Sequence, residues 1–85
     1  DYIMFDISFS INKKSKDYKT YGSSETLDGY KTLIEDAITA TVSEHTEDEC
    51  REDMEGLKEE ILKAVQNLFQ SDFIYKVSIS GVKYG

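Results

Sequence analysis

The chain of 85 residues contains no proline and no tryptophan, and it has one cysteine and one histidine. Because Cys50 is alone, it has no partner for an internal disulfide, and we expect a reducing compartment such as the cytoplasm. No apolar run approaches the length of a membrane span, which predicts a protein outside the membrane. No cleavable signal is visible, and the chain begins with Asp1 rather than Met, as a fragment or a processed protein would.

The residue patterns of enzymes are also missing. The sequence holds neither a Gly-rich phosphate loop nor a nucleophile elbow, and His45 is its only histidine. His45 and Cys50, with Glu44 and Glu49 nearby, invite a metal interpretation, but zinc needs about four ligands in a spaced pattern. We therefore expect no catalytic residue, no cofactor and no metal.

The acidic run from Glu49 to Gly56 does not match a calcium-binding loop. The EF-hand pattern needs oxygen ligands at alternate positions before its glycine and a glutamate six residues after it. Arg51 and Met54 break the alternation, and Leu62 stands where the glutamate belongs. This acidic run is therefore interpreted as a solvated surface.

The charge is strongly negative and unevenly distributed. Seventeen acids and ten bases give a net charge of −7, which opposes binding to nucleic acids or anionic membranes. Residues 47–60 contain eight acids and two bases, whereas residues 12–20 contain four lysines and one aspartate. We therefore expect a dipolar molecule.

Two stretches alternate between apolar and other residues with a period of two, which is typical of half-buried strands. The residues predicted to face the core are Ile3, Phe5, Ile7, Phe9 and Ile11 in the first strand, and Phe73, Tyr75, Val77 and Ile79 in the second. Gly81 is expected to form a bulge in the second strand or to end it.

Apolar residues at helical spacing predict a helix over residues 24–43, with Ser24 as its N-cap, and a second helix up to Gln70. Thr46 is the expected N-cap of the second helix, and Glu49 completes a capping box. Gly56 costs about 1 kcal/mol relative to alanine inside a helix. We interpret it as tolerated, the alternative being the close approach of a neighbour.

We expect the apolar residues of these two stretches to form the faces of two separate helices and not of one continuous helix. Thirteen residues separate Thr41 from Met54, so in one continuous helix the stripes would point about 220° apart. A break at residues 44–46 allows both to face one core, which favours a helical hairpin. A continuous rod in an intertwined dimer is the alternative.

The sequence predicts one small α+β domain over residues 1–85, a two-layer sandwich of order β-(β)-α-α-β. The helical hairpin covers a sheet of two or three strands. Residues 18–21 are the candidate third strand, returning from the first as a hairpin with its lysines protecting the edge. A strand over residues 38–42 is an alternative to the end of the first helix, because this run is rich in β-branched residues.

The acidic face of residues 47–60 carries the main functional hypothesis. A dense negative surface imitates a row of phosphates and steers association with a basic protein, and small acidic inhibitors, including phage-encoded ones, share this composition. The function expected is thus a non-enzymatic interaction module or an accessory protein. Its partner-binding residues would be Glu47, Asp48, Glu49, Glu52, Asp53, Glu55, Glu59 and Glu60.

Two alternatives stay open. A narrow sheet is marginal by itself, so the protein could be an assembly subunit, such as a homodimer, that associates through its sheet edge. The segment 13–21 interleaves bases with aromatic rings, as in single-strand nucleic-acid platforms, although the overall charge makes nucleic acid the less favoured partner. Its candidate contacts are Lys13, Lys14, Lys16, Tyr18, Lys19 and Tyr21.

Overall fold

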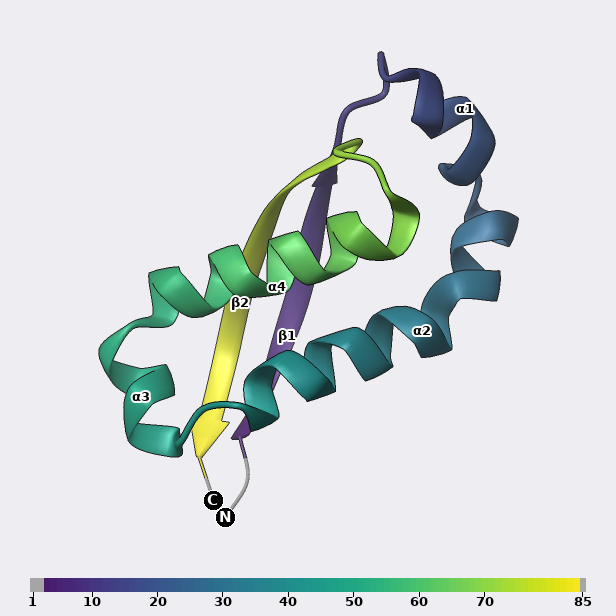
Figure 1. Cartoon of the computed structure of the whole chain (residues 1–85). Helices are drawn as coiled ribbons and strands as arrows, with labels where there is room; N and C mark the ends of the chain where they lie inside the picture. The colour runs from purple at the N-terminus through teal and green to yellow at the C-terminus, as the bar shows by residue number, and fades with distance from the viewer. Residues whose placement is uncertain (1–2, 85) are drawn as a thin grey trace.

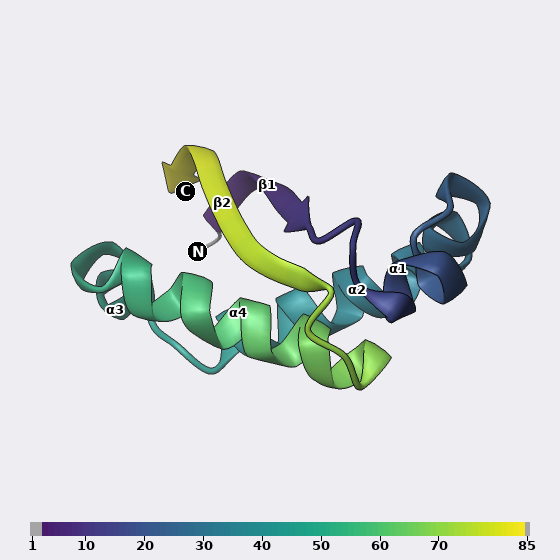
Figure 2. The same cartoon turned by 90° about the horizontal axis from the view of Figure 1, so that it is seen from above.

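The helices lie on one side of a two-stranded antiparallel sheet, as Figures 1 and 2 show. The computed structural model describes residues 3–84. In chain order the elements are β1 (Ile3–Ile11), α1 (Lys16–Tyr21), α2 (Ser24–Ser43), α3 (Glu47–Glu52), α4 (Met54–Phe69) and β2 (Ile74–Tyr84). The predicted α+β class, with helices packed on a small sheet, is confirmed. No helix in the described part of the chain is both long enough and apolar enough to cross a membrane.

Two bulges interrupt the pairing of the strands, and both place the extra residue in β2. Phe5 lies opposite both Gly81 and Val82, and Gly81 has a φ of 62°, which is the geometry of a glycine bulge. The expected bulge at Gly81 is thus confirmed. At the other end Ile11 pairs with Ile74, so Tyr75 is the extra residue. This shift turns Ile74 into the core and leaves Tyr75 57% exposed, so the prediction that Tyr75 faces the core is wrong.

The fully buried core comes from α3, α4 and the start of β2. Leu57, Ile61, Val65 and Phe69 recur along α4 at helical spacing and bury its predicted face. The other buried side chains are Cys50, Phe73, Ile74 and Val77. None of the apolar side chains of α2, and none of the described ones of β1, is fully buried, because the sheet is too narrow to cover both helices. Leu33, one of the apolar residues at helical spacing from which the helix over residues 24–43 was predicted, is 49% exposed. The side chain of Ile3 lies outside the described residues.

Helices α2 and α4 form the predicted hairpin and run in opposite directions (Figure 1). The break falls at residues 44–46, as expected, and excludes one continuous rod. The N-cap of α2 is Ser23 rather than Ser24, because the Ser23 hydroxyl accepts a hydrogen bond from the Thr26 amide at 3.2 Å. Residues 38–42 remain helical to Ser43, so the strand alternative there is wrong.

The helix predicted as continuous from residue 47 to residue 70 is divided at Asp53. Thr46 and Glu49 form the predicted capping box at the start of α3, each side chain accepting from the other residue's amide at 3.1 Å. Asp53 then caps α4 by accepting from the Gly56 amide at 2.9 Å. A Cβ at Gly56 would lie 2.2 Å from an Asp53 carboxylate oxygen, so this glycine makes room for the cap and is not merely tolerated.

The segment predicted as a third strand is helix α1. Ser15 caps it by accepting from the Asp17 amide at 3.2 Å, and the Ser71 hydroxyl donates to the Asp17 carboxylate, which ties α1 to the loop before β2. Tyr21 turns inward and packs against the rings of Phe69 and Phe73. The two tyrosines of the segment are three residues apart, so they share a helical face.

The two glycines of α2 and α4 provide a test of this capping geometry. A Cβ added to Gly29 on α2 would meet no other atom within 4 Å, so Gly29→Ala should raise the free energy of unfolding by about 1 kcal/mol through helix propensity. Gly56→Ala gains the same propensity but displaces the Asp53 cap, worth about 1 kcal/mol, so its net effect should be near zero.

Denaturant unfolding of both variants, alone and with Asp53→Ala, measures the difference. In the Asp53→Ala background the cap is already gone, and Gly56→Ala should then stabilise as much as Gly29→Ala does. Equal stabilisation by both substitutions in the otherwise unchanged chain would contradict the role given to Gly56.

Candidate interaction surfaces

The two edges of the sheet differ in how well they are protected. Strand β2 carries both bulges together with Lys76 and Lys83, features that discourage pairing with another strand. Strand β1 has nine residues, no proline and no lysine, and Asp6 is its only charged residue. Since β1 pairs with β2 on one side, its other side is the regular, unbulged edge of the described sheet. An incoming strand is thus accepted most readily at β1.

An open groove of about 490 Å³ lies between β1 and α2. It is the space left where α2 extends beyond the narrow sheet. None of its apolar side chains is fully buried. These side chains are Phe5, Ile7 and Phe9 from the strand, and Leu27, Ile34 and Ile38 from the helix.

Charged side chains also line this groove. Asp6 belongs to β1, and Asp28, Lys31 and Glu35 belong to α2. All four are exposed, and none of their side chains forms a hydrogen bond or an ion pair with another residue in the described range. The groove therefore combines an apolar floor with three carboxylates and one ammonium group.

The predicted acidic face spans α3 and α4, and much of its charge is used within the protein. Glu47 pairs with Arg51 at 2.7 Å, and Glu55 pairs with Lys58 at 3.0 Å. Asp53 and Glu49 are helix caps, and Glu60 contacts His45. The carboxylates with no such contact among residues 3–84 are those of Asp48, Glu52 and Glu59.

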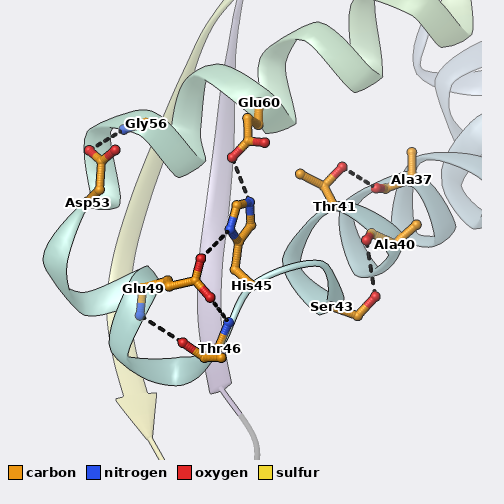
Figure 3. Close-up of polar contacts among 10 residues, drawn as sticks. All are labelled: Ala37, Ala40, Thr41, Ser43, His45, Thr46, Glu49, Asp53, Gly56 and Glu60. Atoms are coloured by element: carbon orange, nitrogen blue, oxygen red, sulfur yellow. Dashed lines mark hydrogen bonds and ion pairs between the residues drawn. The ribbon is translucent and has the colours of Figure 1, made fainter.

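His45 lies in the turn between α2 and α3, between two carboxylates (Figure 3). Its Nδ1 is 3.5 Å from Glu49 Oε2, and its Nε2 is 2.7 Å from Glu60 Oε2. The Nε2 atom is buried, and its contact with Glu60 is a close ion pair without the angles of a good hydrogen bond. His45 thus links α3 to α4 across the break at Asp53, while Thr46 and Glu49 complete the capping box beside it.

The carboxylates control the pKa of His45. Burial alone lowers the pKa, but Glu49 and Glu60 together outweigh it, so the net pKa is raised. The pKa of Glu49 is lowered, first by the amide and hydroxyl of Thr46 and then by His45. At a pH below the raised pKa of His45, the His45 side chain is an imidazolium held between the carboxylates of Glu49 and Glu60.

A pocket of about 200 Å³ lies beside His45 and its two carboxylates, and Cys50 and Glu52 belong to its lining. Glu52 remains exposed there, as we expected for the carboxylates of this stretch. Cys50 is 2% exposed, and burial raises the pKa of its thiol more than the two nearby glutamates do. Over residues 3–84 no three potential ligands are arranged to hold a metal ion.

The candidate nucleic-acid contacts do not form the predicted hairpin. Lys13 and Lys14 lie in the turn after β1, and Lys16 and Lys19 are exposed on α1. Tyr18 and Tyr21 are half-buried against the core, because α1 is held to α4 and to the loop before β2. The aromatic rings are therefore engaged in packing and do not form a stacking platform.

Comparison of the chain with protein-family models, with curated proteins and with solved structures finds no match.

The groove beside β1 is the surface that the sequence predictions did not include. Its two walls are separated in the chain by more than fifteen residues, and their approach depends on the hairpin of α2 and α4. One signal was present, namely the absence of lysine and proline along a strand of nine residues. The bulges in β2, which make β1 the regular edge, were predicted only at Gly81.

The His45 contacts predict a dependence of stability on pH. Since the pKa of His45 is raised above 6.5, its stabilising effect is complete below that pH and is lost as the pH rises through the raised pKa. Since the pKa of Glu49 is lowered from 4.5, its contribution is present above that pH and is lost as the pH falls through the lowered pKa. The combined contribution of His45 and Glu49 to the stability of the fold is therefore largest between pH 4.5 and pH 6.5.

Thermal unfolding of the parent chain and of His45→Gln at about pH 5.5 and about pH 8.5 tests this window. The substitution should lower the midpoint at the acidic pH and have little effect at the alkaline pH. An equal loss at both values would show that His45 acts through packing alone. Lys63→Gln, on an exposed part of α4, serves as the control for an unrelated charge change.

Proposed function

We propose that this protein is a non-enzymatic interaction module that binds a partner protein along the edge of β1 and the adjoining groove. The observation that supports the proposal is the combination of a regular, unprotected strand edge with an open apolar groove beneath it. Strand edges supply backbone hydrogen bonds to a partner, and neighbouring pockets supply specificity for its side chains. The buried Cys50 is compatible with action in a reducing, cytoplasmic compartment.

A second candidate surface is the predicted acidic face. It now consists of the three carboxylates that form no hydrogen bond or ion pair with another described residue. Asp48 and Glu52 on α3 and Glu59 on α4 keep a negative field that would steer a basic partner. The other acids of the predicted set form caps and ion pairs, so their substitution would also destabilise the fold.

Site-specific photo-crosslinking in extracts of the source cells distinguishes these surfaces. A photoreactive side chain is placed at Lys31 or Thr39 in the groove, at Asp48 or Glu52 on the acidic surface, and at Asp36 as a control on α2 outside the groove. All five positions are exposed, so the fold should tolerate the change.

The proposal predicts adducts with another protein from the groove positions and none from Asp36. Adducts formed only from Asp48 and Glu52 would favour the acidic surface instead. Adducts of twice the chain mass would identify an assembly subunit, and the absence of adducts at every position would contradict an interaction module.

A further inference from the structure

Helix α3 is attached to the core of the protein through a single fully buried side chain. Cys50 is 2% exposed, whereas four of the other five side chains of α3 are exposed. The ion pair of Glu47 with Arg51 lies within the helix and does not attach it to another element. Segments with few buried contacts open at a lower free energy than the whole fold unfolds. We therefore expect α3 to open more readily than α4, which buries four side chains.

The backbone departs from the helical path at both ends of α3. Residues 44–46 form the turn that follows α2, and Thr46 at its end is extended. At the other end Asp53, with a φ of −136° and a ψ of 64°, caps both α3 and α4. A helix between two such joints moves as one body, because a few residues at each end absorb the change in dihedral angles.

The side chain of His45 connects α3 to α4 across this arrangement (Figure 3). Its Nδ1 lies 3.5 Å from Glu49 of α3, and its Nε2 lies 2.7 Å from Glu60 of α4. An imidazolium carries a positive charge and donates from both nitrogens, whereas a neutral imidazole donates from only one. Loss of the proton therefore removes an attraction that acts on both helices through His45.

The pocket between α3 and α4 shows which other titratable groups face His45. Besides its two carboxylates these are Cys50, Glu52 and Asp53, and no described residue of α2 lines the pocket. Carboxyl groups ordinarily stay ionised above about pH 5.5, and burial raises the pKa of the Cys50 thiol. Between about pH 5.5 and about pH 8.5, His45 is thus the group of this pocket whose charge changes.

We propose that α3 is a pH-sensitive flap, a short helix that protonated His45 holds closed over Cys50. When His45 is neutral, the carboxylates of Glu49 and Glu60 line the pocket from two helices with no positive charge between them, and they repel each other. The helix then turns about its two joints and uncovers the thiol. Since the pKa of His45 is raised, opening increases as the pH rises through that pKa. The flap involves neither β1 nor the groove, so it is independent of the proposed function.

The rate at which dipyridyl disulfide modifies Cys50 measures the opening of the flap. The parent chain and His45→Gln are compared at about pH 5.5 and about pH 8.5. Both chains carry the same thiol, so the ratio of their rates at one pH cancels the ionisation of the thiol itself. His45→Gln should react about threefold faster than the parent at the acidic pH and at the same rate at the alkaline pH. An equal ratio at the two pH values would overturn the role of His45.

A matched pair of substitutions on α4 tests the contact itself. Glu60→Gln removes the carboxylate beside Nε2 of His45 and should raise the rate at about pH 5.5 by a similar factor. Glu59→Gln makes the same change in charge at an exposed residue that has no hydrogen bond or ion pair among the described residues. It should leave the rate unchanged. Equal effects of the two substitutions would show that overall charge controls the rate, and they would overturn the proposal.

Urea separates the opening of α3 from the unfolding of the whole chain. Global unfolding exposes a large surface and becomes about tenfold more favourable for each 1 M urea, whereas the opening of a helix of six residues exposes little. The modification rate of the parent chain should therefore change less than about twofold up to about 1 M urea. A rise of about tenfold would show that Cys50 reacts only after global unfolding, and it would overturn the flap.

Discussion

The packing of α4 against β2 is the contact on which the rest of this structure depends. Ile61 and Val65 of α4 and Phe73, the residue before β2, are completely buried, and Phe69 joins them to the rings of Tyr21 and Tyr30. The remaining elements attach to this unit with less burial. No side chain of α2 is fully buried, and β1 is joined to the core by its pairing with β2 and by the partly buried side chains of Ile7, Phe9 and Ile11.

This uneven distribution of burial explains why the candidate site lies where it does. A sheet of two strands covers α4 but leaves one flank of α2 without a strand above it, so the groove and the free edge of β1 have one common cause. The acidic stretch plays a mainly structural part at the other end of the hairpin. There Glu49 and Asp53 cap α3 and α4, and Glu49 and Glu60 contact His45 on both sides. The stretch that was predicted as one helix is thereby divided into two.

Local patterns in the sequence were sufficient for the elements whose side chains meet one core. The alternation in β1, the helical spacing of α4 and the capping box at Thr46 all appear in the structure as predicted. Tyr75 was misplaced because a bulge changes the phase of β2, and alternation carries no sign of an extra residue. Helix α1 was missed because the four lysines suggested an edge strand, while the spacing of its tyrosines and Ser15 indicated a capped helix. The groove depends on how distant elements approach one another, which periodicity does not determine.

The central claim is that β1 has one edge paired and one edge open. Amide hydrogen exchange, measured residue by residue on the protein at low concentration, tests it most directly. The account predicts slow exchange along α4 and β2, and an alternation along β1 in which amides directed at β2 are protected and those on the free edge exchange rapidly. Uniform protection of every β1 amide in the isolated protein would show that the edge is already covered, and it would contradict the account.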